Sequence, residues 1–175
     1  LIDLEPGTQL SWYFAGPAGA TLLLAGSGGY GFLATVEQMS SRLKAGKALI
    51  TCGEGETVTR PSPVSGVSGA VPLPAATHVA CASTGGRILS FEIGELNAMA
   101  NGGRGLKLID LEAKDTLAGA AAYTRSVRID GIGRGGKPRD ETLEIRSLNN
   151  AMAGRARKGK AADLGFKPTG IVRVL

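Results

Sequence analysis

Histidine, cysteine and aromatic residues are scarce in this sequence. Its 175 residues include one histidine, His78, and two cysteines, Cys52 and Cys81, whose spacing matches no zinc motif. A Cys/His metal site within one chain is therefore excluded, and two thiols in a chain this long are typical of small buried residues in a reducing cytosol. No serine stands in a Gly-x-Ser-x-Gly motif, which excludes the nucleophile arrangement of α/β-hydrolases.

Long apolar runs and a signal peptide are also lacking. Apolar runs such as Ala20–Ala25 are far too short to span a bilayer, and no association with a membrane is expected. Asp3 and Glu5 stand where a secretory signal would carry basic residues. Because the chain begins at Leu1 rather than at a methionine, we expect it to be a fragment of a longer protein.

The charge is unevenly distributed. Residues 1–100 carry five Lys and Arg against seven Asp and Glu, a net charge of −2, whereas residues 101–175 carry fifteen against eight, a net charge of +7. A basic half on a small domain favours a polyanionic partner, because a phosphate backbone binds clustered Lys and Arg. The alternative is a solvated basic face that binds nothing.

A repeated pattern organises the chain. Each of three units contains an apolar segment, a Gly-Gly pair, a second apolar segment, an acidic motif, a Gly-rich basic loop and a short apolar segment. The Gly-Gly pairs begin at Gly28, Gly85 and Gly135, at intervals of 57 and 50 residues. A period of about 50 residues is typical of propeller-like arrays, in which each unit is a small sheet.

Each Gly-Gly pair predicts a β-hairpin between short apolar strands. Strands are predicted at 21–25, 31–35, 77–82 and 87–91, and after the basic loops at 49–52, 108–111 and 161–164. No stretch shows sustained helical periodicity. We therefore predict an all-β, propeller-like fold with about three complete four-stranded units and a partial N-terminal unit.

One domain with several units is expected. The predicted boundaries are 1–19 for the end of a truncated unit, 20–59, 77–119 and 120–175 for complete units, and 60–76 for a connector rich in Pro, Ser and Gly. The connector is assigned because proline disrupts the pairing of strands.

The Gly-rich loops carry the candidate phosphate-binding residues. Lys and Arg supply the charge, and glycine allows backbone N–H groups to approach a polyanion closely. The candidates are Arg42, Lys44 and Lys47 in the first loop, Arg104 and Lys107 in the second, Arg134 and Lys137 in the basic segment 133–140, and Arg155, Arg157, Lys158 and Lys160 in the third loop. Such contacts depend on the backbone and the deformability of DNA rather than on its base sequence.

Two stretches carry a resemblance to a known family. Residues 29–33 (GYGFL) with 41–49 (SRLKAGKAL), and residues 83–91 (STGGRILSF) with 102–109 (GGRGLKLI), resemble blades of the C-terminal domain of the topoisomerase IV A-subunit (ParC), in the family that includes the gyrase A-subunit tail. The resemblance covers nearly the whole chain. It implies a β-pinwheel, whose four-stranded blades exchange strands with their neighbours and whose basic outer rim binds bent duplex DNA.

The resemblance also implies a role. It is that of an accessory domain, without a catalytic site or a cofactor of its own, in a bacterial ATP-dependent type II DNA topoisomerase. The implied partners are double-stranded DNA, the catalytic core of the same polypeptide, and the ATPase subunit of the parent heterotetramer. The implied location is the cytoplasm, at the nucleoid.

One departure distinguishes the two branches of this family. Gyrase tails carry a Gln-Arg-Arg-Gly-Gly-Lys-Gly box, which this sequence lacks, and this favours topoisomerase IV, with roles in relaxation, decatenation and chromosome segregation. Gly133–Lys137 resembles the core of the box, but the repeat places it at a hairpin turn.

Two other interpretations remain open, and a third finds no support in the sequence. The chain is a gyrase A-subunit tail, or a propeller-like scaffold for a protein partner, which would need an exposed apolar patch. A propeller enzyme would need acidic or histidine side chains that converge on the axis, and such clusters are absent. Glu37, Glu92 and Glu144 are expected at equivalent positions in separate units, where a structural role is favoured over catalysis.

Overall fold

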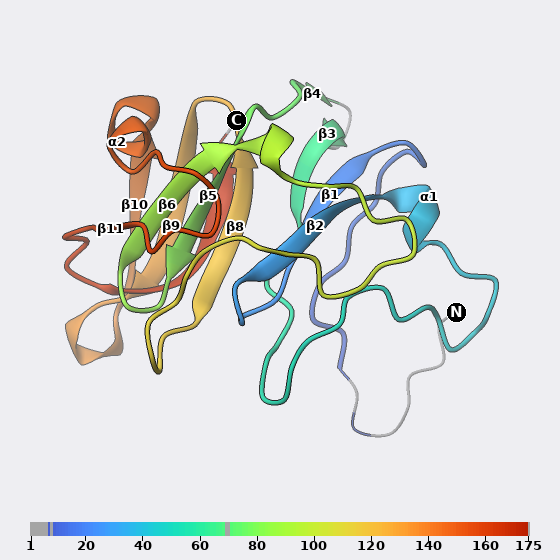
Figure 1. Cartoon of the computed structure of the whole chain (residues 1–175), viewed down its shortest axis with the longest axis horizontal. Coiled ribbons are helices and arrows are strands. Elements are labelled where there is room, and N and C mark those ends of the chain that lie inside the picture. Colours follow the sequence, from blue (N-terminus) through green and yellow to red (C-terminus); the bar gives the residue numbers. More distant parts are fainter. Residues whose placement is uncertain (1–6, 8, 69–70, 175) are drawn as a thin grey trace.

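Three antiparallel sheets stand side by side in the computed structural model, which describes residues 7, 9–68 and 71–174 (Figure 1). Their strand orders are β4-β3-β1-β2-β7, β11-β6-β5-β8 and β10-β9-β12. The strands are β1 (Thr21–Ala25), β2 (Tyr30–Thr35), β3 (Ser62–Ser68), β4 (Val71–Leu73), β5 (His78–Ser83), β6 (Arg87–Glu92), β7 (Leu106–Lys107), β8 (Leu117–Tyr123), β9 (Ser126–Ile132), β10 (Pro138–Glu144), β11 (Lys160–Ala161) and β12 (Lys167–Val174). The helices are α1 (Val36–Met39), η1 (Ile93–Glu95), η2 (Arg134–Gly136) and α2 (Ile145–Asn150). The predicted all-β pinwheel is confirmed.

Each sheet is built on one of the predicted hairpins. β1 pairs with β2, β5 with β6 and β9 with β10, and a later strand (β3, β8 or β12) joins the other edge of the first strand of each hairpin. In the third hairpin both strands have seven residues, so its basic turn extends further than the turns of the other two (Figure 1). The Gly135-Gly136 segment therefore lies in a hairpin turn, as the repeat predicts.

The Pro-rich segment 60–76 also takes part in the first sheet. It contains β3 and β4, and Leu22 of β1 lies opposite Pro63, next to an irregularity in the register. Proline is tolerated there because a bulge leaves ladder positions that need no N–H donor. A segment expected to connect two units thus contributes two strands to the first of them.

Short strands cross from one unit to the sheet of the previous one. β7 pairs with the start of β2, where Lys107 lies opposite Tyr30, and β11 pairs with the start of β6, where Lys160 lies opposite Ile88. This strand exchange, which the family resemblance implies, completes the first and second sheets. Within the described residues the third sheet receives no such strand, so β10 forms one of its edges.

The exchanged strands differ from the predicted ones. The predicted strands 108–111 and 161–164 are wrong in position, because β7 and β11 are two residues long and begin earlier. Leu108 N still donates to Gly29 O at 2.7 Å, but Leu108 and Ile109 lie outside the strand, with their side chains fully buried in the core. Residues 49–52 form only an isolated bridge, between Ile50 and Gly103.

Each crossing depends on a glycine. Gly105 has φ +83°, and a Cβ on it would lie 2.3 Å from the carbonyl oxygen of Gly31. Gly159, at the equivalent place, has φ +71° and would meet the carbonyl oxygen of Ile88 at 2.6 Å. Any other residue would clash with the backbone that the exchanged strand has to approach, and would also strain its own backbone.

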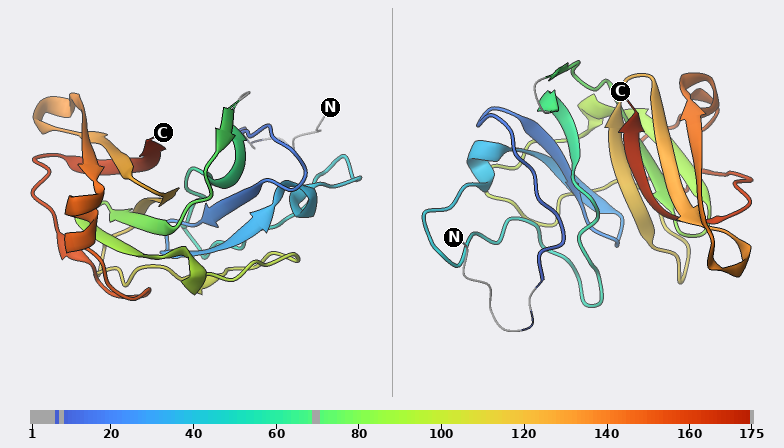
Figure 2. Two further views of the ribbon diagram at one scale, coloured as in Figure 1. Left: turned by 90° about the horizontal axis from the view of Figure 1, so that it is seen from above. Right: turned by 180° about the vertical axis from the view of Figure 1, so that it is seen from behind.

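The core consists mainly of two layers, on either side of the second sheet. Along β5, Val79 and Cys81 pack toward the first sheet, whereas Ala80 and Ala82 pack toward the third. Both faces of this sheet are therefore buried, and its strands read as continuous apolar runs rather than as an alternating pattern. The small side chains of β5 and β8 allow the sheets to pack closely. Figure 2 shows the course of the strands of the three sheets from two further sides.

The second strand of each hairpin leads into a helical turn. Glu92 and Glu144 are the residues before η1 and α2, but the residue before α1 is Thr35. The expectation that Glu37 is equivalent to these two glutamates is therefore wrong by two positions. Thr35 serves instead as a helix cap, because its side chain and that of Gln38 each accept a hydrogen bond from the backbone N–H of the other.

Gly105→Ala tests the crossing. We expect it to lower the free energy of unfolding by about 3 kcal/mol, because the new methyl group meets the backbone of β2. Gly46→Ala is the matched control, since Gly46 also has a positive φ, +80°, but faces open space. It should cost only about 1 kcal/mol. Urea unfolding of both variants measures the difference, and equal losses would contradict the steric argument.

A buried hydroxyl pair provides a second test. Tyr123 Oη and Ser90 Oγ lie 2.5 Å apart between β8 and β6, and both residues are fully buried. Tyr123→Phe should lower the unfolding free energy by about 1–3 kcal/mol, because it leaves the serine hydroxyl unpaired. The same change at Tyr13, which is 91% exposed, should alter stability by less than about 0.5 kcal/mol. An unchanged denaturation midpoint for Tyr123→Phe would contradict the prediction.

Candidate nucleic-acid interface

The three basic loops are joined through their backbones. Gly103 N donates to Leu49 O at 2.8 Å, and Thr51 N donates to Gly103 O at 2.9 Å. In the next pair of loops, Ala156 N donates to Leu108 O at 2.9 Å and Asp110 N donates to Arg157 O at 3.0 Å. We call residues 41–51, 101–110 and 154–160 together the loop ribbon.

The first loop of the ribbon presents free cations. Arg42 and Lys44 are exposed and form no hydrogen bond or ion pair within the described part of the chain. Lys47 is more constrained, because its Nζ donates to Gln38 O at 3.0 Å and to Ala100 O at 3.4 Å. The Lys47 side chain therefore connects α1 with the start of the second loop, whereas Arg42 and Lys44 face solvent.

The cations of the second loop are already paired. Arg104 donates to Glu56 Oε1 at 2.7 Å, and its guanidinium lies 4.3 Å from the centre of the Tyr30 ring. Lys107 forms an ion pair with Asp110, and their hydrogen bond raises the pKa of the lysine and lowers the pKa of the aspartate. A phosphate would have to compete with these carboxylates for both cations.

The third loop contains one structural arginine and several free cations. Arg155 Nη1 donates to Lys107 O at 2.6 Å, and the backbone N of Arg155 donates to Glu95 Oε2 at 2.8 Å. Arg157, Lys158 and Lys160 are exposed, and their side chains form no hydrogen bond or ion pair with the residues the structure describes. Of the predicted phosphate-binding residues in this loop, Arg155 therefore connects two loops, and the other three are available to a ligand.

A second group of cations lies on the third sheet. Arg134 and Lys137, in the turn between β9 and β10, are exposed as expected. Sequence analysis missed two exposed neighbours: Arg139, at the start of β10, and Lys167, which starts β12 opposite Ile132. The polar, highly charged character of Pro138–Glu144 is the signal that would have revealed Arg139.

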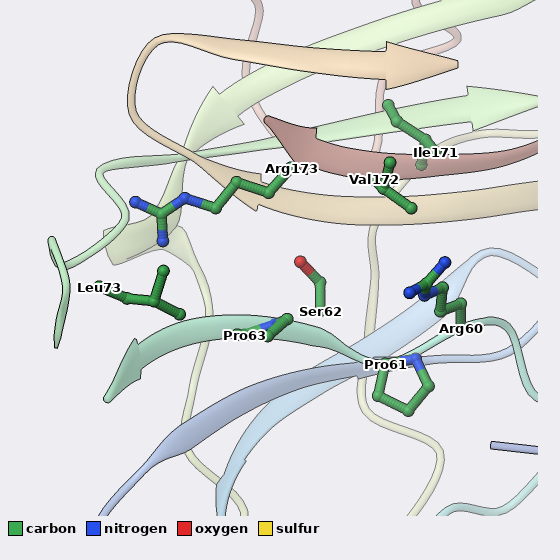
Figure 3. Close-up of a pocket in the computed structure, with 8 residues that line it drawn as sticks. All are labelled: Arg60, Pro61, Ser62, Pro63, Leu73, Ile171, Val172 and Arg173. Carbon is green, nitrogen blue, oxygen red and sulfur yellow. The ribbon is translucent and has the colours of Figure 1, made fainter. Parts of the chain in front are cut away.

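Two further arginines line a cavity of about 170 Å³ between β3 and β12 (Figure 3). Arg60 and Arg173 lie at opposite ends of it, with Ser62 between them. Arg173 Nη2 donates to Pro74 O at 2.8 Å, and burial lowers the pKa of this guanidinium. Arg60 is exposed and lies 5.7 Å from the Trp12 ring. Neither arginine was predicted as a site residue, because their segments belong to no repeated loop.

A metal site and a nucleophile each require particular side chains among the described residues. Among the described residues, no three His, Cys, Asp or Glu side chains come close enough to hold a metal ion. Burial raises the pKa of the Cys81 thiol far above its usual range, which makes it a poor nucleophile. No described helix has the length and apolar character needed to cross a membrane.

Comparison with known proteins gives consistent matches. The family described as "DNA gyrase C-terminal domain, beta-propeller" matches residues 77–123. The A subunit of DNA topoisomerase 4 from Neisseria gonorrhoeae is 34% identical over 161 residues, which are 91% of this chain and 20% of that protein. Its counterpart from Pseudomonas aeruginosa is 27% identical over 93% of this chain and 21% of that protein. The chain thus spans about a fifth of the length of these curated relatives.

Solved structures agree with the sequence matches. The E. coli ParC C-terminal domain superposes with a TM-score of 0.77 and 25% identity, over 97% of this chain and 66% of that one. A structure of the DNA gyrase A C-terminal domain has a TM-score of 0.63 at 16% identity, over 87% and 47%, which supports the fold alone. The sheets, the exchanged strands and these matches agree: the chain belongs to the β-pinwheel family formed by the C-terminal domains of the A subunits of DNA gyrase and topoisomerase IV.

Proposed function

We propose that this domain binds duplex DNA on the loop ribbon, without base-sequence specificity. The observation that carries the proposal is the set of backbone hydrogen bonds that joins the three loops, so that free cations of separate repeats belong to one connected ribbon. Arg42, Lys44, Arg157, Lys158 and Lys160 supply the charge, and the neighbouring glycines allow close approach of a phosphate backbone. We propose Arg134 and Lys137, which are exposed in the β9–β10 turn, as further contacts with DNA.

The parent protein is, in this proposal, the A subunit of a bacterial topoisomerase IV. The matched relatives bear that name, and the absence of a gyrase box from the sequence favours this branch. The domain would position DNA segments for relaxation and decatenation, while strand cleavage and ATP hydrolysis would reside elsewhere in the heterotetramer. It would need no cofactor, and it would act at the nucleoid in the cytoplasm.

A protein-binding scaffold is the second candidate. Trp12 and Tyr13 are 46% and 91% exposed, and they lie beside the apolar outer face of the first sheet. Exposed apolar side chains of this kind are a common feature of protein interfaces. This candidate predicts weak binding to DNA even at low salt.

Titration of a labelled duplex of about 40 base pairs tests the leading proposal. Arg157→Ala, Lys158→Ala and Lys160→Ala are combined in one variant, and binding is measured at several salt concentrations. For every phosphate that the variant no longer neutralises, the slope of log affinity against log salt should become shallower by about 0.9.

A second triple variant controls for net charge. Arg60→Ala, Arg125→Ala and Arg146→Ala remove three exposed cations that lie outside the ribbon and outside the β9–β10 turn. Their removal should weaken binding far less than removal of the ribbon cations. Equal effects of the two triple variants would contradict a binding path on the ribbon, and a wild-type protein that does not bind would favour the scaffold.

Arg155 should behave differently from its neighbours. Arg155→Ala removes the hydrogen bond between the second and third loops, and it should lower the free energy of unfolding by about 1 kcal/mol. Arg157→Ala should change stability by less than about 0.5 kcal/mol, because its side chain is exposed and free of partners in the described structure. Thermal unfolding alongside the DNA titration separates the two roles, and identical profiles for both variants would refute the distinction.

A further inference from the structure

We propose that Glu56 withholds Arg104 from DNA, so that the middle loop of the ribbon binds less strongly than the loops on either side. The inference rests on the proposed function and adds a residue that sets affinity. Glu56 lies outside the basic loops, in the turn that follows the first of them.

The fold holds the Glu56 carboxylate in place. Oε2 accepts a hydrogen bond from Gly53 N at 2.6 Å, and Oε1 accepts one from Arg104 Nη2 at 2.7 Å. The side chain is only 20% exposed. A Cβ on Gly28 would lie 1.9 Å from Oε1, so the first hairpin accommodates this carboxylate only because a glycine stands there. A carboxylate fixed in this way loses little conformational entropy when it pairs with a cation.

Arg104 has a second partner on the other side. Its guanidinium lies 4.3 Å from the centre of the Tyr30 ring, a distance suited to a cation–π interaction. The carboxylate and the ring together direct this cation toward the first sheet. Arg104 nevertheless remains 47% exposed, so removal of the carboxylate would return it to the set of cations that DNA can reach.

The next repeat supplies an internal comparison. Asp115 occupies the position of Glu56, because each residue follows a residue of positive φ (Lys114 at +68° and Gly55 at +73°). Each also donates its backbone N–H to the carbonyl three residues earlier, at 3.0 Å for Asp115 and 3.1 Å for Glu56. Asp115 lies against the second hairpin, as Glu56 lies against the first, since a Cβ on Gly85 would meet its carboxylate at 2.8 Å.

The shorter acid engages different partners. Asp115 Oδ1 accepts hydrogen bonds from Thr84 Oγ1 and from Gly85 N, both at 2.7 Å. The cation equivalent to Arg104 in that repeat is Lys158, because each directly precedes the glycine of a strand crossing, Gly105 or Gly159. Lys158 forms no ion pair within the described residues. The two repeats thus differ both in the length of the acid and in the cation, and only the longer acid, Glu56, pairs with the cation of the following loop.

Glu56→Gln tests this inference against Glu54→Gln. Both changes add one unit to the net charge, but Glu54 is exposed and has no partner in the described part of the chain. The glutamine at 56 can still accept from Gly53 N. We expect Glu56→Gln to increase the affinity for a labelled 40-base-pair duplex at low salt about threefold beyond Glu54→Gln. It should also steepen the slope of log affinity against log salt by about 0.9.

Glu56→Asp distinguishes the effect of side-chain length from the effect of charge. It keeps the net charge and copies the arrangement of Asp115, so it should release Arg104 and increase the affinity for DNA in the same direction. Equal gains in Glu56→Gln and Glu54→Gln, or no gain in Glu56→Asp, would overturn the proposal. Either result would mean that the affinity for DNA depends only on the net charge of the domain.

Labelling with phenylglyoxal gives a readout that does not depend on DNA. Modification of Arg104, followed by mass spectrometry of its peptide, should be several-fold faster in Glu56→Gln than in the wild type or Glu54→Gln. Unchanged labelling would overturn the proposal. If the wild type fails to bind the duplex while Arg104 labelling rises in Glu56→Gln, the proposed function fails, and Glu56 is still supported as the residue that covers this cation.

Discussion

Two short crossings, at Gly105 and Gly159, join three small sheets into one structure. A sheet of three or four short strands has little stability alone, because much of its apolar surface stays exposed. Each crossing inserts backbone from one repeat into the sheet of the previous repeat, and it brings the buried residues that follow, such as Leu108 and Ile109, under that sheet. The crossings also fix where the second and third basic loops run, because each of these two loops contains a crossing.

Much of the fold could be predicted from the sequence because its signals are local. A Gly-Gly pair between apolar segments determines a hairpin whatever surrounds it, so β1, β2, β5 and β6 lie where expected. The exchanged strands were misplaced, because two residues in a ladder leave no period that a pattern could reveal. Glu37 was misaligned for a related reason: Thr35 and a glutamate can both precede a helical turn, and the sequence match favoured the shared acid.

The candidate interface was predictable as a set of loops but not residue by residue. Repetition of Gly with Lys and Arg located the loops, and the backbone hydrogen bonds between them could not be read from composition. Arg104 and Arg157 look alike in sequence, yet one faces Glu56 from a distant turn and the other faces solvent. Such pairings depend on side-chain length and on how close separate repeats lie in the folded structure. Neither distance nor orientation between repeats can be inferred from the sequence pattern.

The third sheet has a further property, which follows from the edges that it leaves open. Strands at a sheet edge carry unpaired N–H and C=O groups, and these attract strands of other molecules. In the described structure β10 and β12 are both edges, and each begins with or near a proline, Pro138 or Pro168. β10 continues with Arg139, Asp140 and Glu141, all exposed, and β12 has a register irregularity after Pro168. Proline, charge and irregular register all discourage edge-to-edge association at these two strands of the described structure.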